Sequence, residues 1–244
     1  MLTVNLKNIS LKSSEVERTL LSEINFSLSS NKIHTIIGSN GAGKSTLLKS
    51  LTGLLPESSF KITGEVLYEN INLLDCSEEQ IKNIRREKIK YIFQDPVTSF
   101  DPLRRLGYYF RGFIPVREDF VNELLEYFML PPGEILFEMY PHQLSGGMAQ
   151  RLSLALASAA SPEILLLDEP TSGIDAPMVN LVIHFLKNFV KVTNNTVLLV
   201  THDLLYAKAV SDLIALLEDG HISAFLPVDD FFNEKKLTLN RIYD

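Results

Sequence analysis

The sequence predicts an α/β fold with a mostly parallel sheet, because short apolar runs alternate with stretches of helical periodicity. Two runs, Ile164–Leu167 and Val197–Val200, are apolar throughout, as is typical of parallel strands covered on both faces. A third run, Ile33–Gly38, ends in glycine and precedes a helical pattern over Lys44–Leu51. These observations together favour strand–helix–strand units.

The remaining elements follow the same alternation. Two more β-rich runs precede the middle of the chain, and the last two form a closing hairpin across Glu218-Asp219-Gly220. The predicted strands are Ile62–Leu67, Ile89–Phe93, Leu213–Leu217 and His221–Phe225, and the predicted helices are Ser145–Ala160, Asp175–Val190 and Asp203–Ser211.

The middle of the chain differs from the rest. From about Pro102 to Pro141 the patterns are helical and no strand is evident, with Val116–Met129 as the clearest helix. We therefore expect a helical insertion in the α/β core.

Composition limits the possible classes of protein. A length of 244 residues fits one large α/β domain. The net charge of −7 argues against generic nucleic-acid binding, which needs a basic face. The single cysteine, Cys76, cannot form a disulfide within the chain, so a reducing compartment is expected. Neither a signal peptide nor an apolar run near the ~20 residues of a membrane span is apparent.

A glycine-rich loop follows the first predicted parallel strand. It fits the pattern G-x-x-x-x-G-K-[ST], whose backbone N–H groups surround phosphate oxygens at the start of a helix. Lys44 is expected to reach the β- and γ-phosphates, and the Ser45 hydroxyl to bind Mg²⁺. The loop consists of Gly38, Ser39, Asn40, Gly41, Ala42, Gly43, Lys44, Ser45 and Thr46.

Two carboxylates follow the apolar strand Ile164–Leu167. Ligands of open parallel sheets lie beyond the carboxyl ends of the strands. Asp168 is therefore placed to hold Mg²⁺ through water, and Glu169 to polarise a water for attack on the γ-phosphorus. The alternative is an ordinary turn, since Asp, Glu and Pro are all common after strands.

Between these motifs lies Leu144–Arg151, which reads Leu-Ser-Gly-Gly-Met-Ala-Gln-Arg. With the two motifs above, it makes the chain resemble the ATP-binding subunit of ABC transporters over essentially its whole length. Gln94 resembles that family's Q-loop glutamine, Ser172–Asp175 its D-loop and Thr201–Asp203 the segment with its switch histidine.

The resemblance implies a specific architecture. It predicts a P-loop NTPase core with a mostly parallel sheet, an antiparallel β subdomain and a helical insertion. Residues 1–94 and 161–244 would form the core, and residues 95–160 the helical signature subdomain.

The resemblance also implies ATP and Mg²⁺ as cofactors, and two chains that meet head to tail. Ser145, Gly146 and Gly147 of one chain would cover the γ-phosphate held by the other. Gln94 would contact Mg²⁺ and sense the attacking water, and His202 would contact the γ-phosphate and align that water. Local alternatives are that the Ser-Gly-Gly segment is a plain helix cap and His202 a buried neighbour of one.

Longer strings narrow the resemblance to the peptide/nickel importer branch. They are Gln94–Pro102 and Tyr140–Met148. This branch implies transmembrane permease subunits, a second ATP-binding subunit, identical or paralogous, and indirectly a solute-binding protein. It implies no nucleic acid, and a peripheral position on the cytoplasmic face of the membrane.

Two departures from the family pattern bear on the site. The stretch Ile9–Ser14 contains no Tyr, Phe or Trp to stack on adenine, which predicts weaker discrimination between bases. Gly173 stands where the D-loop usually has alanine, which predicts a more flexible loop.

The sequence leaves two questions open. The first is whether an aromatic group after the Q-loop lines a groove for a permease helix or the core of the insertion. The second is what the chain does. It could energise an importer, act as a soluble ABC ATPase on nucleic acid or ribosomes, or bind ATP as a partner with a low-activity site. The aromatic group consists of Tyr108, Tyr109, Phe110 and Phe113.

Overall fold

The computed structural model describes residues 1–12, 17–113, 118–192, 194–235 and 238–239. Its strands are β1 (Leu2–Leu11), β2 (Arg18–Ser27), β3 (Ile33–Ile37), β4 (Phe60–Tyr68), β5 (Ile71–Asn72), β6 (Ile89–Ile92), β7 (Ile164–Asp168), β8 (Thr196–Thr201), β9 (Leu213–Glu218), β10 (His221–Ile222) and β11 (Leu226–Pro227). One sheet is antiparallel, in the order β2-β1-β4-β5. The other has the order β10-β9-β3-β8-β7-β6 and is parallel from β9 to β6, with β11 pairing to β9.

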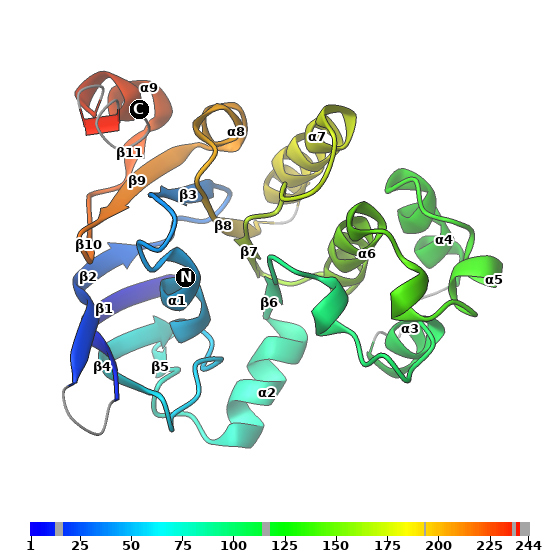
Figure 1. The fold of residues 1–244 in the computed structure, drawn as a ribbon, viewed down its shortest axis with the longest axis horizontal. Coiled ribbons are helices and arrows are strands. Elements are labelled where there is room, and N and C mark those ends of the chain that lie inside the picture. Colours follow the sequence, from blue (N-terminus) through cyan, green and yellow to red (C-terminus); the bar gives the residue numbers. More distant parts are fainter. Residues whose placement is uncertain (13–16, 114–117, 193, 236–237, 240–244) are drawn as a thin grey trace.

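The helices cover the parallel sheet and build the part of the molecule beyond β6 and β7 (Figure 1). Between residues 102 and 141, none of the described residues lies in a strand, in agreement with the helical patterns of this stretch. No described helix is both long and apolar enough to cross a membrane. The helices are α1 (Lys44–Ser50), α2 (Glu78–Glu87), α3 (Gly107–Phe113), α4 (Glu118–Tyr127), α5 (Gly133–Leu136), α6 (Gly146–Ala159), α7 (Ala176–Val192), α8 (Leu204–Val210) and α9 (Val228–Glu234).

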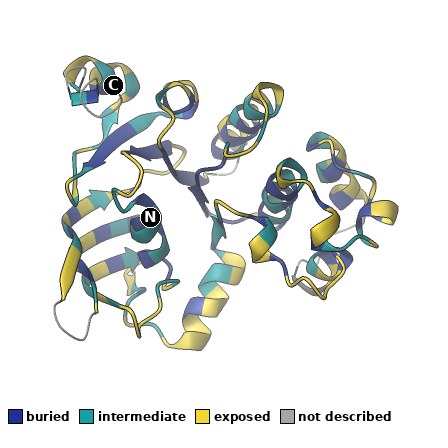
Figure 2. Cartoon of the chain, in the orientation of Figure 1, coloured by how far each residue is buried: buried dark blue, intermediate teal, exposed yellow. Residues whose placement is uncertain are grey.

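The parallel sheet lies between two hydrophobic clusters. Every residue of β3, β7 and β8 is buried (Figure 2). Side chains alternate between the two faces along a strand. On one face, Leu165 and Leu167 of β7 belong to the same cluster as Leu125 of α4 and Phe128 just after it. Leu166 packs on the other side, in the cluster that holds the antiparallel sheet and α1. The continuous apolar runs of the sequence therefore mark strands buried on both faces.

Strand register brings four loops to one edge of the parallel sheet. Ile37 of β3 lies beside Thr201 of β8, and Val200 lies beside Asp168 of β7. Ile92 of β6 lies beside Leu167 of β7 in the same parallel sense. The segments that follow β3, β6, β7 and β8 therefore start next to one another, where ligands of open α/β sheets bind.

The predicted α/β class and most predicted elements are confirmed, but one strand is shorter than predicted. The second strand of the closing hairpin ends at Ile222 instead of Phe225. The backbone N–H of Leu216 donates to the Ser223 hydroxyl, so a side chain replaces the ladder partner there. The ring of Phe225 packs edge-on against His34.

Several elements were not predicted from the sequence, namely β1, β2, β5, β11, α2 and α9. The predicted helix Val116–Met129 corresponds to α4, and residues 116 and 117 lie outside the described part of the chain.

Candidate functional site

The glycine-rich loop connects β3 to α1. Gly43 has φ +97°, a left-handed conformation that suits glycine, and it is the N-cap residue of α1. A Cβ atom on Gly38 would lie 2.5 Å from the carbonyl oxygen of Leu217 in β9. The loop thus rests directly on the neighbouring strand, and its shape depends on the glycines that the motif requires.

Lys44 lies inside this loop and is only 6% exposed. Its Nζ donates to the carbonyl oxygens of Gly38 at 2.9 Å and Ser39 at 3.1 Å. The same Nζ lies 3.5 Å from Oε1 of Glu169. A buried cation is therefore held at the start of a helix, facing a carboxylate from the end of β7.

Asp168 is the last residue of β7 and is 2% exposed. Its Oδ1 accepts a hydrogen bond from the Ser45 hydroxyl at 2.7 Å, as expected for two residues that share a metal. Its Oδ2 accepts from the Tyr91 hydroxyl at 2.8 Å. Burial and the charge of Asp168 raise the pKa of Tyr91, so this hydroxyl keeps its proton and donates.

Glu169 has φ +49°, which is uncommon for a residue with a Cβ atom. Its Oε2 accepts from the Thr201 hydroxyl at 3.1 Å and lies 3.0 Å from Nδ1 of His202. The carboxylate is 6% exposed, whereas the side chain of His202 is 52% exposed. Strained backbone of this kind is often found at functional sites, where surrounding contacts hold it in place.

The structure thus brings together five of the predicted residues: Lys44, Ser45, Asp168, Glu169 and His202. Within the described part of the chain, no cluster of three or more His, Cys, Asp or Glu side chains could hold a metal unaided. One hydroxyl and one carboxylate nevertheless fit Mg²⁺, which usually takes its other ligands from water and substrate phosphates.

Gln94 and the Ser-Gly-Gly segment come from other elements than the residues of this cluster, namely the end of β6 and the start of α6. Gln94 is exposed, two residues beyond the end of β6. Ser145 caps α6 by accepting from the N–H of Met148 at 3.2 Å. In Figure 1, α6 stands on the far side of β7 from α1. A Cβ atom on Gly146 would meet nothing within 4 Å, so packing within the chain does not explain this glycine.

A cavity of about 420 Å³ adjoins the phosphate loop. Besides the loop, its walls are Arg18–Leu20 of β2 and Leu217–Gly220 of the β9–β10 turn. The turn is fixed to β2 because the N–H of Ser22 donates to the carbonyl of Gly220 at 2.9 Å. The stretch Ile9–Ser14 was predicted to border the base, and its residues 13 and 14 lie outside the described part.

Sequence reasoning missed Tyr91 and Arg18 as members of the site. The sequence does show a tyrosine on the strand that precedes Gln94. Its contact with Asp168 could not be predicted, because it depends on the strand register that places Tyr91 beside Leu166. The signal for Arg18 was weaker, because β2 itself was not predicted.

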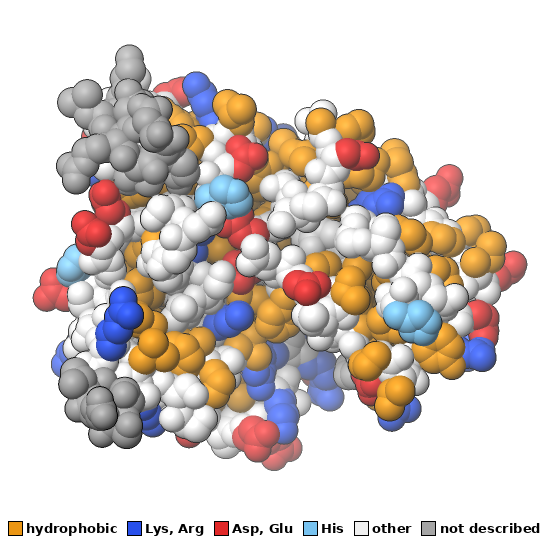
Figure 3. All heavy atoms as spheres, viewed as in Figure 1, with side chains coloured by type: hydrophobic (Ala, Val, Ile, Leu, Met, Phe, Trp, Pro, Cys, Tyr) orange, Lys and Arg blue, Asp and Glu red, His pale blue; other side chains and the backbone are white. Residues whose placement is uncertain are grey.

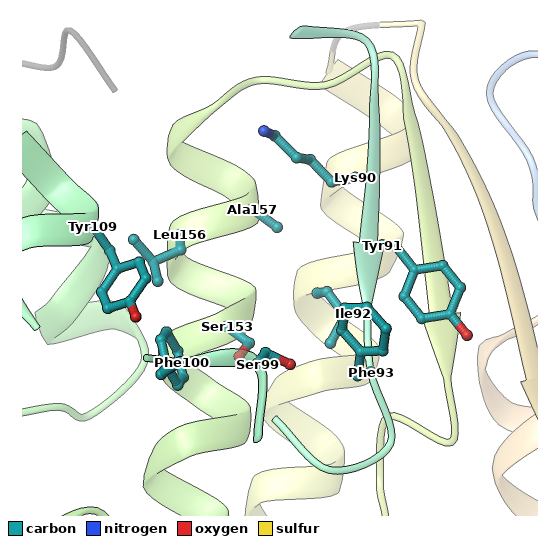
Figure 4. A pocket seen from close by; sticks show the side chains of 10 residues that line it. All are labelled: Lys90, Tyr91, Ile92, Phe93, Ser99, Phe100, Tyr109, Ser153, Leu156 and Ala157. Carbon is teal, nitrogen blue, oxygen red and sulfur yellow. The ribbon is translucent and has the colours of Figure 1, made fainter. Parts of the chain in front are cut away.

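The aromatic residues after the Q-loop separate into core and surface. Phe110 is buried in the core, whereas Tyr108 is 43% exposed beneath the Arg104 guanidinium. Tyr109 and Phe100 line a cavity of about 190 Å³ between β6 and α6 (Figure 4). The side chain of Phe113 lies outside the described part.

The D-loop segment leads into α7. Gly173 has φ +75°, so a side chain would be strained there. The Asp175 carboxylate accepts from the N–H of Met178 at 3.0 Å and caps the helix.

Comparisons with known proteins agree with this geometry. A family model described as ABC transporter matches residues 21–172. A dipeptide transport ATP-binding protein of Lactococcus lactis subsp. cremoris is 34% identical over 218 residues, 86% of this chain and 62% of that protein. The chain therefore spans less than two thirds of that relative's length. The metal-staphylopine import system ATP-binding protein of Staphylococcus aureus is 29% identical over 230 residues, 91% of this chain and 84% of that protein.

A solved structure has the same fold. It is a dimeric ATP-binding cassette in a post-hydrolysis state, bound to ADP and Pi, with a TM-score of 0.79 and 28% identity. The superposition covers 93% of this chain and 99% of that one. Because the family model covers more than half of the chain and the fold agrees, this chain belongs to the ABC transporter family.

Proposed function

We propose that this chain binds ATP with Mg²⁺ and hydrolyses it. The observation that carries the proposal is the buried cluster in which Lys44, Asp168 and Glu169 meet at the phosphate loop. Lys44 and the loop N–H groups would bind the β- and γ-phosphates. Ser45 and Asp168 would hold Mg²⁺, which neutralises charge on the phosphates when bound.

Glu169 is the residue that we assign to the attacking water. Its Oε2 is held by Thr201 and His202, which fixes the carboxylate at the end of β7. A carboxylate in this position polarises a water for attack in line with the leaving phosphate. His202, half exposed beside it, would contact the γ-phosphate and orient both groups.

We infer that each complete site needs a second chain. Ser145 and Gly146 are exposed, and Gly146 faces open space. The N-terminus of α6, with its free N–H groups, suits a phosphate that another chain supplies. Two chains meeting head to tail would place this segment over the γ-phosphate of the partner. The dimeric form of the similar cassette structure supports this arrangement.

The base of the nucleotide is assigned to the cavity beside the phosphate loop. Arg18 and the Leu217–Gly220 turn line it, so neither wall includes an aromatic ring. A guanidinium stacks on any base, which agrees with weak discrimination between bases.

The names of the relatives favour import of peptides or metal chelates. The chain would then lie on the cytoplasmic face of the membrane, bound to permease subunits. A solute-binding protein would deliver the cargo to those permeases. Gln94 and the helical residues 95–160 would transmit the nucleotide state to those permeases. Peptide, nickel and metal-chelate cargo remain alternatives, because other subunits select the cargo.

A nucleic-acid partner has less support. The net charge is −7, and on the face shown in Figure 3 Lys and Arg are interspersed with acidic and hydrophobic side chains. A low-activity site also has less support, because Glu169 and His202 are both present and in contact.

The test measures ATP binding and phosphate release with Glu169→Gln. We expect ATP affinity to remain and hydrolysis to fall roughly hundred-fold or more, because the amide polarises water poorly. Glu65→Gln, on the exposed side of β4, is the matched control. Turnover near the wild-type rate in Glu169→Gln would contradict the assignment.

Co-purification of permeases from solubilised membranes tests the importer role, and recovery of ribosomes or nucleic acid would contradict it.

A further inference from the structure

Tyr91 makes a contact for which the proposed roles do not account. Its hydroxyl donates to Oδ2 of Asp168 at 2.8 Å, while the Ser45 hydroxyl donates to Oδ1 at 2.7 Å. Each oxygen of the buried carboxylate therefore has one hydroxyl partner, one from α1 and one from β6. A carboxylate held at both oxygens cannot rotate freely about its last bond.

The position of Tyr91 follows from the register of two parallel strands. Tyr91 of β6 lies beside Leu166 of β7, so its long side chain reaches forward along β7 to Asp168. The ring of Phe93, two residues on, packs against it with centroids 4.5 Å apart. Figure 4 shows the Tyr91 hydroxyl on the side of β6 away from Tyr109 and Leu156. The ring is thus supported, and the hydroxyl is aimed at the carboxylate.

The geometry points to Tyr91 as a positioning residue for the metal, an inference that rests on the proposed function. By holding Oδ2, Tyr91 keeps Oδ1 directed at Ser45, where the two residues would share Mg²⁺. Groups that hydrogen-bond to metal-binding carboxylates fix their orientation, and their loss weakens metal binding. Gln94 follows two residues after the end of β6, so Tyr91 also joins the segment that precedes the Q-loop to the metal-binding carboxylate.

Removal of the hydroxyl has a predictable consequence. In Tyr91→Phe the ring and its contact with Phe93 remain, but Oδ2 of Asp168 loses its donor at a site only 2% exposed. A buried acceptor without a partner is unfavourable, so the carboxylate turns toward water or other donors. Its orientation toward Ser45 is then no longer fixed before the metal binds.

The experiment titrates Mg²⁺ at saturating ATP and measures phosphate release. We expect Tyr91→Phe to raise the half-saturating Mg²⁺ concentration roughly ten-fold or more. The maximal rate at high Mg²⁺ should stay close to wild type, and binding of a fluorescent ATP analogue in EDTA should be unchanged. Tyr68→Phe is the matched control, because the Tyr68 hydroxyl donates to the Glu163 carboxylate at 2.5 Å outside the site.

Each outcome decides the inference. An unchanged Mg²⁺ dependence in Tyr91→Phe would overturn it, and so would a lower maximal rate with an unchanged half-saturating concentration, since that indicates a structural role alone. If Tyr91→Phe fails to fold, Tyr91→Met, which also lacks the donor, is measured in the same way. A wild-type chain without Mg²⁺-dependent hydrolysis would instead overturn the proposed function, so the two failures can be told apart.

Discussion

At the scale of single residues, the site is defined by buried charges that compensate one another. Lys44 and Glu169 are both less than a tenth exposed, and their charged atoms lie 3.5 Å apart. Burial of either charge alone would be unfavourable. The phosphates of ATP would supply further negative charge to Lys44, and Glu169 would then be free to act on water.

We predict that Lys44→Ala weakens ATP binding roughly hundred-fold, because a charge-assisted bond to the phosphates is lost. Titration with a fluorescent ATP analogue measures this effect. Lys49→Ala, in the last turn of the same helix, is the control and should bind as wild type does. Unchanged affinity in Lys44→Ala would refute the assignment of the phosphate loop.

A second residue-scale prediction concerns pH. Burial lowers the pKa of His34 from 6.5 to about 4. The unfolded chain therefore takes up a proton at a higher pH than the folded chain does. The His34 contribution is complete above the unfolded pKa and is lost as the pH falls from about 6.5 toward about 4.

Between about pH 7.5 and about pH 5, the loss amounts to about 2 kcal/mol of unfolding free energy. Urea unfolding at several pH values measures this change. His34→Gln keeps an acceptor for the N–H of Ser29, which His34 binds at 3.2 Å, and should show a smaller slope against pH. Equal slopes in the two proteins would show that His34 does not titrate as predicted.

At the scale of elements, α6 has a start that serves two purposes. Ser145 caps the helix within the chain, and we propose that the same residue faces the phosphate of a partner. Substitutions of Ser145 can separate the helix-capping role from the role at the partner's phosphate. Ser145→Ala removes the cap and should lower stability by about 1 kcal/mol.

Ser145→Asp keeps a capping side chain but places a negative charge where the γ-phosphate is expected. We predict that Ser145→Asp keeps wild-type thermal stability and loses most ATP hydrolysis, because like charges repel. Thermal unfolding and phosphate release measure the two effects. A Ser145→Asp chain that hydrolyses ATP normally would limit Ser145 to the helix cap.

Elements with strong local signals were predictable, and those without them were not. Ile164–Leu167 and Val197–Val200 lie in β7 and β8 because unbroken apolar runs of that length suit buried parallel strands. The helix α2 was overlooked, although Ser77 and Gln80 form a capping box that its sequence spacing signals. The hairpin end was misjudged because the Ser223 hydroxyl competes with the strand ladder.

At the scale of the whole molecule, the Ser-Gly-Gly segment and the phosphate loop belong to different parts of the chain (Figure 1). If two copies meet head to tail, one site uses the phosphate loop of one chain and Ser145 of the other. A mixture of two inactive variants should therefore regain activity. Lys44→Ala and Ser145→Asp, each of which should lose most hydrolysis alone, form one intact site when they pair.

We predict that an equal mixture recovers about a quarter of the wild-type rate, since half of the dimers carry one good site of two. Phosphate release from the mixture, compared with each variant alone, measures the recovery. Two variants that both alter the phosphate loop, Lys44→Ala and Ser45→Ala, serve as the control pair and should not recover. No recovery in the first mixture would contradict a dimer of identical chains.

The sequence by itself determined the α/β class and the glycine-rich loop between a strand and a helix, and it singled out Asp168, Glu169 and His202 as candidate site residues. Those features depend on local patterns: apolar runs, glycines at fixed spacing and polar residues at strand ends. Only the tertiary structure decided that Tyr91 holds Asp168, that Glu169 contacts His202, and that Arg18 and the β9–β10 turn form the cavity wall. These contacts join segments far apart in the chain, and they depend on the register between strands and on the twist that brings the two sheets together. No local pattern encodes either quantity, because each is set by how the two hydrophobic clusters pack around β3, β7 and β8.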